Sequence, residues 1–219
     1  MEIKMNALKG LEIARKKILF RPDINSPIDP VTKKIVNDNR LKKNAVTLKY
    51  MLENGAAVAL IAHQGDTQDY QNLIPLMEHA QKLTALTGHP VHYIDDVCGP
   101  AAIEAVKKLP AGEAIILGNL RYLGEELSTF SNFVKLSPEE MQSVWHVRKL
   151  APLFDLYVND AFRRLIAEHR LWLPFRMCCP RQRAFSFLMN MPHCLRSRTM
   201  QSIPACLCWA VQRFPMPLV

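Results

Sequence analysis

The chain has 219 residues and a formal net charge of +8. The charge is concentrated at one end: residues 163–219 contain nine arginines, no lysine and one acid, Glu168, whereas residues 1–162 contain nineteen basic and nineteen acidic residues. The neutral first 162 residues are long enough for a domain with its own core, and their charge balance argues against a nucleic-acid-binding body.

Two features of this body bear on its compartment. The first twenty residues have scattered charges and no continuous apolar stretch, so we expect no secretory signal, and the longest apolar runs are too short to span a bilayer. Cys98 is the one cysteine before residue 163, which fits a reducing environment. We therefore expect a cytoplasmic protein that has no membrane partner.

Short apolar segments alternate with amphipathic ones along the body. In residues 38–54, Leu41, Ala45, Leu48 and Leu52 recur at helical spacing and form one apolar face. The short segments are apolar throughout, which is typical of parallel strands that are covered on both faces. In chain order we expect a strand at 17–20, a helix at 38–54, a strand at 56–62, a helix at 73–86, a strand at 90–94, a helix at 100–109, a strand at 114–117, a helix at 138–153 and a strand at 155–158.

This order predicts an α/β fold, in which helices cover both faces of a parallel sheet. Polar residues gather where the predicted strands end, and open parallel sheets bind ligands outside the carboxyl ends of their strands. The sequence therefore predicts a binding site at that edge of the sheet. The candidate residues are Arg21, Asp23, Asn25, Arg40, His63 and Arg121.

Several arginines with a histidine at one sheet edge suit a small phosphorylated anion, because a guanidinium binds phosphate or carboxylate through two parallel hydrogen bonds. Asp23 and Asn25 could accept hydrogen bonds from ligand hydroxyls. We find no glycine-rich phosphate loop, CxxC or HExxH motif, so we expect no metal site. Structural alternatives stay open: Asp23 could form a turn, and His63 could simply be packed. Arg40 and Arg121 could pair with neighbouring acids at the surface.

Several motifs resemble, in order and spacing, the N-terminal domain of phosphoglycerate kinase in its archaeal form: RPDINSPID, NDNR, AHQG, GNLRY and YVNDAF. The resemblance covers about residues 12–162. It implies two Rossmann-like domains joined by a hinge, of which the N-terminal one binds 3-phosphoglycerate or 1,3-bisphosphoglycerate and the C-terminal one binds Mg-ADP or Mg-ATP. Domain closure would then allow the glycolytic and gluconeogenic phosphoryl transfer between 1,3-bisphosphoglycerate and ADP, which gives 3-phosphoglycerate and ATP.

The resemblance also assigns roles to individual residues. Asp23 and Asn25 would hold the hydroxyl and carboxylate end of the glycerate. His63 and Arg121 would hold the substrate phosphate and carboxylate. Arg40 would be the catalytic residue, because it would stabilise the charge that spreads over the transferring phosphoryl group.

Some positions depart from the family's pattern. Pro22 stands where the family has valine and removes a backbone donor at the strand end. Asp66 replaces a substrate arginine, which reverses the charge near a bound phosphate, and Gly118 replaces an acid. We place Asp66, together with Arg21, as a secondary candidate of the site. These departures predict either reduced activity or a changed substrate.

After Phe162 the composition changes in the middle of a motif. In the family, NDAF is followed by small residues and then by AHR, whose arginine completes the substrate site; here residues 163–179 read RRLIAEHRLWLPFRMCC. Codons can be chosen for this stretch so that a frame shifted by two bases reads AAHRGTPSMVAFPDVL, which is similar to the family's continuation. We therefore interpret residues 163–219 as an irregular out-of-frame tail and residues 1–162 as an incomplete substrate-binding domain.

Other interpretations of the tail stay open: an arginine-rich arm for nucleic acid, a cysteine-rich metal site without regular zinc spacing, or a membrane-surface segment. On the frameshift interpretation the product is an inactive monomer that lacks the hinge and the nucleotide domain and that has no nucleic-acid partner. The alternative functions are a non-catalytic binder of a phosphorylated three-carbon acid and a basic protein that interacts through its tail.

Resequencing the coding DNA across the Phe162 codon tests the frameshift interpretation. We expect an open second frame that encodes AHR and, further downstream, a glycine-rich nucleotide-binding domain. A single confirmed frame with nothing kinase-like in the other frames would overturn the interpretation and make the arginine-rich tail a genuine feature.

Overall fold

The structure is a computed structural model that describes residues 8, 11–65, 72–126, 134 and 140–161. Residues 163–219, and with them the predicted tail, lie outside the described residues. The elements in chain order are β1 (Lys17–Arg21), α1 (Asn39–Glu53), β2 (Ala57–Leu60), α2 (Met77–Thr87), β3 (Val91–Tyr93), α3 (Pro100–Lys108), β4 (Ala114–Ile116), α5 (Trp145–Leu150) and β5 (Leu156–Asn159).

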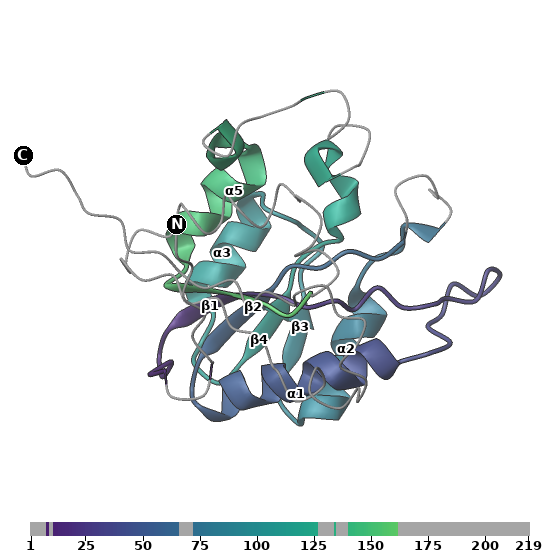
Figure 1. The fold of residues 1–219 in the computed structure, drawn as a ribbon, viewed down its shortest axis with the longest axis horizontal. Helices are drawn as coiled ribbons and strands as arrows, with labels where there is room; N and C mark the ends of the chain where they lie inside the picture. The colour runs from purple at the N-terminus through teal and green to yellow at the C-terminus, as the bar shows by residue number, and fades with distance from the viewer. Residues whose placement is uncertain (1–7, 9–10, 66–71, 127–133, 135–139, 162–219) are drawn as a thin grey trace, which may run out of the picture.

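The described elements form three layers, with the sheet in the middle (Figure 1). The strand order is β3-β4-β2-β1-β5, and every pair is parallel. Helices α1 and α2 cover one face, and α3 and α5 cover the other. This arrangement confirms the α/β fold with a parallel sheet between helical layers that the sequence predicts.

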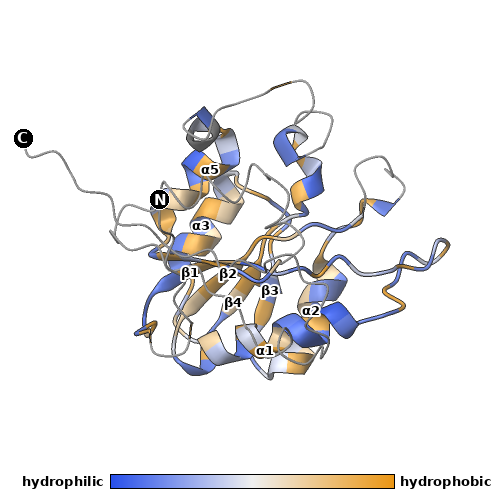
Figure 2. Ribbon diagram, in the orientation of Figure 1, coloured by the Kyte–Doolittle hydropathy of each residue, from blue (hydrophilic) through white to orange (hydrophobic). Residues whose placement is uncertain are grey.

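Each face of the sheet has its own apolar core, because successive side chains of a strand point to opposite faces. On β1, Ile18 and Phe20 belong to the cluster under α1 and α2, and Leu19 belongs to the cluster under α3 and α5. Figure 2 shows the strands in orange and polar residues on the outer surfaces of the helices. Since both faces are covered, charged side chains are left to the ends of the strands.

Helix α1 is fixed at both ends in the way its sequence suggests. The Asn37 side chain accepts a hydrogen bond from the backbone N–H of Asn39 at 2.9 Å, and Asp38 pairs with Lys42 one turn further on. Gly55, which follows the helix, has a φ of +74°, a conformation that glycine adopts without strain. These ends place the N-terminal turn of α1 at the carboxyl edge of the sheet.

One predicted helix starts later than expected. The sequence predicts a helix at 73–86, but α2 begins at Met77. The reason is Pro75, which restricts the residue before it to extended conformations and so keeps Ile74 out of the helix. The residues before α2 contact another loop instead, because the Ile74 carbonyl accepts a hydrogen bond from the Asn119 side chain, which follows β4.

Another predicted helix is broken up. The expected single helix at 138–153 consists, in its described part, of a 3-10 turn at Glu140–Ser143, the six-residue α5 and a second 3-10 turn at Ala151–Leu153. Val144 interrupts it with a ψ of 145°, outside the helical region. Pro152, which has no N–H, prevents a regular continuation at the other end.

No helix among the described residues is long and apolar enough to cross a bilayer.

Each helical layer contains one buried histidine. Burial lowers the pKa of His79 on α2 to about 4. Burial and the positive charge of Arg21 lower the pKa of His146 on α5 to about 4. A Glu126 oxygen lies 3.6 Å from Nε2 of His146, so this contact joins a carboxylate to a neutral imidazole near pH 7.

These two histidines predict acid sensitivity. A histidine whose pKa is lowered by folding contributes stability that is present above its unfolded pKa of about 6.5 and is lost as the pH falls towards the folded value. We expect the free energy of unfolding, measured by urea denaturation of the 219-residue chain, to fall between pH 6.5 and pH 4. The His146→Gln variant should show a shallower fall.

The matched control is His92→Gln, since the His92 side chain is 61% exposed. It should leave the pH dependence as in the parent chain. An identical slope in the parent and in the His146→Gln variant would contradict the assignment of acid sensitivity to His146.

Candidate functional site

The candidate side chains follow the ends of three neighbouring strands, on the right of the sheet in Figure 1. Arg21 ends β1, and Asp23 and Asn25 follow it in the next loop. His63 lies three residues after β2, and Arg121 lies in a 3-10 turn, Leu120–Tyr122, after β4. Arg40 lies in the first turn of α1. The structure therefore places all six candidates at one edge.

Asn119 joins the loops that follow β2 and β4. Its Oδ1 accepts hydrogen bonds from the backbone N–H groups of Gln64 at 3.1 Å and Arg121 at 3.0 Å. Its Nδ2 donates to the carbonyls of Gln64 and Ile74, both at 2.9 Å. The side chain is 0% exposed, so its full set of donors and acceptors is used inside the protein.

This junction is the topological switch point of the described sheet. The chain leaves β2 towards the layer of α1 and α2, and it leaves β4 towards the layer of α3 and α5. Ligands of open α/β sheets bind where neighbouring strands send their connections to opposite faces. The Leu120 N–H bonds to the Ala62 carbonyl at 3.0 Å, so the next residues along, His63 and Arg121, begin side by side.

The loop after β1 reaches the same place. Asn25 Oδ1 accepts a hydrogen bond from the backbone N–H of Gly65 at 3.1 Å. Gly65 has a φ of +89°, and a Cβ there would lie 2.7 Å from the Asn72 carbonyl oxygen. The positive φ and the close approach of Asn72, which lies further along the same connection, therefore require glycine at this position.

Asp23 and Arg40 form an ion pair, with 2.7 Å between Oδ1 of Asp23 and Nη1 of Arg40. The Arg40 side chain is 43% exposed and that of Asp23 is 27% exposed, so both can reach a ligand. Asn44, one turn after Arg40, donates Nδ2 to the Asp23 carbonyl at 3.0 Å. A partly exposed pair of this kind adds little stability, which leaves its charges available for binding.

Arg21 and Arg121 converge instead on Glu126. Arg121 donates a hydrogen bond from Nη1 to the Glu126 backbone carbonyl at 2.7 Å, and Nη2 of Arg21 lies 3.7 Å from the Glu126 carboxylate. Both arginines are nearly buried, with 5% and 6% of their surface exposed. Glu126 therefore sets the direction of both guanidinium groups. Sequence patterns do not point to Glu126, because Arg121 bonds to its backbone oxygen and not to its side chain.

The end of β5 closes the other side of β1. The Asp160 N–H bonds to the Arg21 carbonyl at 2.9 Å, and its Oδ2 accepts a hydrogen bond from the Thr47 hydroxyl of α1 at 2.8 Å. Burial raises the pKa of Asp160; the Thr47 hydrogen bond opposes this, and the negative charge of Asp23 adds to it. Asp160 thus ties α1, and with it Arg40, to the sheet.

Two departures from the family's pattern have different outcomes. Asp66 lies outside the described residues. Gly118 packs closely, since a Cβ there would lie 3.1 Å from Cγ2 of Val97 and 3.2 Å from the carbonyl carbon of Asp96. A larger residue at this position would require the loop after β3 to move. The absence of a side chain at Gly118 therefore lets the segments that follow β3 and β4 pack closely.

The arrangement suits an anion with hydroxyl groups. Arginine side chains from three segments supply positive charge and donors, and Asp23 and Asn25 supply acceptors. Within the described ranges, no three His, Cys, Asp or Glu side chains gather as a metal ion would require.

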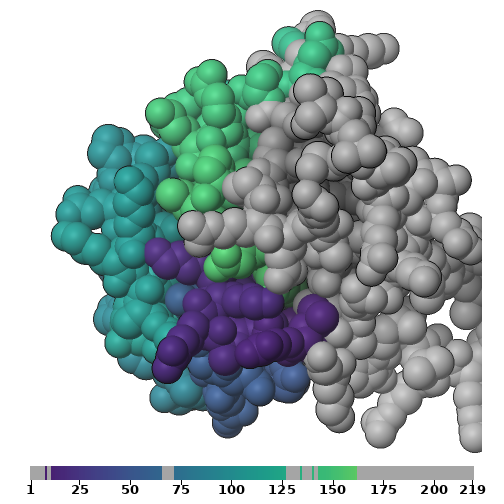
Figure 3. Space-filling model, turned by 90° about the vertical axis from the view of Figure 1, so that its left-hand side faces the viewer, coloured from purple at the N-terminus to yellow at the C-terminus, as the bar shows by residue number. Residues whose placement is uncertain are grey.

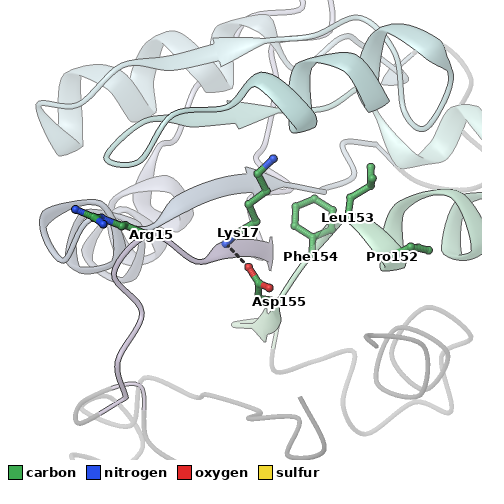
Figure 4. A pocket seen from close by; sticks show the side chains of 6 residues that line it. All are labelled: Arg15, Lys17, Pro152, Leu153, Phe154 and Asp155. Atoms are coloured by element: carbon green, nitrogen blue, oxygen red, sulfur yellow. Dashed lines mark hydrogen bonds between the residues drawn. The ribbon is translucent and has the colours of Figure 1, made fainter. Parts of the chain in front are cut away.

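The opposite, amino-terminal edge carries a pocket of about 270 Å³ between β1 and β5. Figure 3 views the molecule from that side, where the purple N-terminal residues adjoin the green α5–β5 region, and Figure 4 shows the residues that line the pocket. The Lys17 backbone N–H bonds to Asp155 at 2.9 Å, and its ammonium group donates to the carbonyls of Val106 and Lys107 at the end of α3. Because the Lys17 ammonium group is already bonded to carbonyls at the end of α3, we place the functional site at the carboxyl edge.

The Asn119→Ala variant tests the junction. It leaves two N–H groups and two carbonyls buried without their partner, so we expect the free energy of unfolding of the 219-residue chain to fall by roughly 2–4 kcal/mol in urea denaturation. Asn54→Ala is the control, because the Asn54 side chain bonds only at the exposed end of α1. A change at Asn119 as small as that at Asn54 would contradict the role of the junction.

Comparisons with known proteins identify the family of the chain. The family model described as phosphoglycerate kinase matches residues 8–190. The phosphoglycerate kinase of Sulfurisphaera tokodaii is 39% identical over 161 residues, which are 74% of this chain and 37% of that protein. That of Sulfolobus acidocaldarius is 37% identical over 169 residues, 77% of this chain and 38% of that protein.

A solved structure agrees as well. The crystal structure of the Pyrococcus horikoshii phosphoglycerate kinase has a TM-score of 0.72 and 32% identity, and the match covers 84% of this chain and 42% of that one. The chain thus spans well under half the length of the relatives that it matches. Over its own length the match is extensive: the chain belongs to the phosphoglycerate kinase family.

Proposed function

We propose that the carboxyl edge of this sheet binds 3-phosphoglycerate or the glycerate end of 1,3-bisphosphoglycerate, as the substrate-binding half of a phosphoglycerate kinase. The observation that carries this proposal is the convergence of residues from separate motifs on one switch point, within a chain that belongs to this family. Asp23 and Asn25 would bind the hydroxyl and carboxylate end of the glycerate. His63, Arg121 and Arg40 would bind its anionic groups.

Arg40 is the best placed of these to act on the transferring phosphoryl group. It is the most exposed charge of the cluster, and its partner Asp23 can exchange a guanidinium for a ligand hydroxyl. A guanidinium that meets a phosphoryl group stabilises the charge on its oxygens during transfer. Arg21 would act on the site indirectly, since its guanidinium turns to Glu126.

These 219 residues by themselves would bind the acid without turning it over. Phosphoryl transfer requires the nucleotide and its metal in one closed site with the acyl phosphate, and the family assigns the nucleotide to a second domain. We therefore propose binding without ATP formation as the property of this polypeptide.

Isothermal titration of the 219-residue chain with 3-phosphoglycerate tests the proposal. We expect a single site, and we expect the Arg40→Ala variant to raise the Kd at least tenfold, which corresponds to about 1.4 kcal/mol. The urea midpoint of this variant should stay near that of the parent, because the lost ion pair is partly exposed.

Arg148→Ala is the control, since Arg148 lies exposed on α5 in the other helical layer and should leave the Kd unchanged. Absence of binding by the parent chain would refute the binding proposal. Formation of ATP from ADP and 1,3-bisphosphoglycerate by the purified chain would refute the inactivity.

A further inference from the structure

The Gln64 side chain is buried between two loops that carry candidate substrate residues. Its Oε1 accepts a hydrogen bond from the Ser26 backbone N–H at 2.9 Å, and its Nε2 donates to the Ser26 carbonyl at 2.8 Å. Gln64 is the next residue after His63, and Ser26 is the next after Asn25. The Gln64 amide thus pairs with both the N–H and the C=O of one residue, as a residue of a neighbouring antiparallel strand would.

His79 of α2 also bonds to the Gln64 amide. Its Nε2 lies 3.1 Å from Gln64 Oε1. Because that oxygen can only accept, His79 must carry its proton on Nε2. The ring is 0% exposed, and burial keeps it neutral near pH 7 because its pKa is lowered to about 4. The Oε1 atom therefore has two donors, which fixes the amide's orientation.

The loop after β2 is joined to its two neighbouring loops by further hydrogen bonds. Gly65, after Gln64, donates its N–H to Asn25 Oδ1, and the Gln64 backbone bonds to Asn119 through both its N–H and its carbonyl. Gln64 itself makes five hydrogen bonds, and through them it holds the loop after β2 to the loops after β1 and β4. Freedom of its side chain would let the Asn25 loop move relative to His63.

We propose that Gln64, oriented by His79, is a positioning residue that fixes the distance between Asn25 and His63 so that both reach the same phosphorylated acid. The inference rests on the proposed function, since it concerns how the same site is pre-organised. Gln64 itself has no exposed polar atom to offer a ligand, being 2% exposed. Its effect on binding passes through the loops that it holds together.

The test uses the 219-residue chain and the Gln64→Met variant, which removes both amide functions at nearly constant volume. We expect the Kd for 3-phosphoglycerate to rise about tenfold. We also expect hydrogen exchange at the Gly65 amide to become about tenfold faster without ligand, because its acceptor Asn25 is no longer held. This second measurement does not depend on ligand binding.

Two controls separate positioning from general destabilisation. Gln81→Met makes the same replacement at an exposed position of α2 and should change neither quantity. Val106→Ala creates a cavity in the opposite layer, so it lowers stability but should leave the Kd and Gly65 exchange unchanged. If Gln64→Met does not fold, His79→Leu removes the donor to Oε1 and should raise the Kd by a smaller factor, about threefold.

Each outcome decides one statement. Weaker binding and faster exchange in Gln64→Met, with Val106→Ala as in the parent, support the inference. A Kd and an exchange rate within twofold of the parent, in Gln64→Met or in its His79→Leu substitute, overturn it. If the parent chain binds no 3-phosphoglycerate, the proposed function fails, and Gly65 exchange alone then decides whether Gln64 fixes the loops.

Discussion

The structure at the carboxyl edge depends on one buried amide, that of Asn119. A parallel sheet that sends its connections to opposite faces opens between the two strands where the direction changes, and here that point lies between β2 and β4. The backbone groups beyond the ends of these strands have left the ladder and still need partners. Asn119 provides four of these partnerships, so the gap is closed by a side chain where the ladder stops.

The arginines of the site are ordered by the same need. Both faces of the sheet are apolar and covered, so a guanidinium can be accommodated only at the edge, where loop carbonyls and carboxylates replace water. Arg121 and Arg21 are held by Glu126, whereas Arg40 is held only by a partly exposed carboxylate. The site therefore combines two oriented, nearly buried charges with one that can move to a ligand.

The sequence predicts the order and type of nearly all elements, because apolar runs and helical spacing reflect burial directly. Periodicity alone does not predict where α2 begins or how the segment before β5 is divided, since these depend on the backbone at Pro75 and Val144. Strand ends identify the candidate side chains, and the fold brings them to one edge. Asn119 and Gln64 could not be found in this way, because their partners are largely backbone atoms distant in the sequence, 55 residues apart for Asn119 and Gln64. Glu126 could not be found either, because Arg121 bonds to its backbone oxygen, which every residue has.

The position of β1 has a consequence for synthesis. This strand is the first of those that the structure describes, yet it pairs with both β2 and β5, and its hydrogen bond to Asp155 spans 138 residues. On the ribosome, β1 can pair with β2 early, but its other edge stays open until β5 emerges. Such long-range parallel pairing folds slowly, and an open edge in the meantime is a template for other chains. Until β5 is synthesised, the open edge of β1 can therefore pair with another chain in its place.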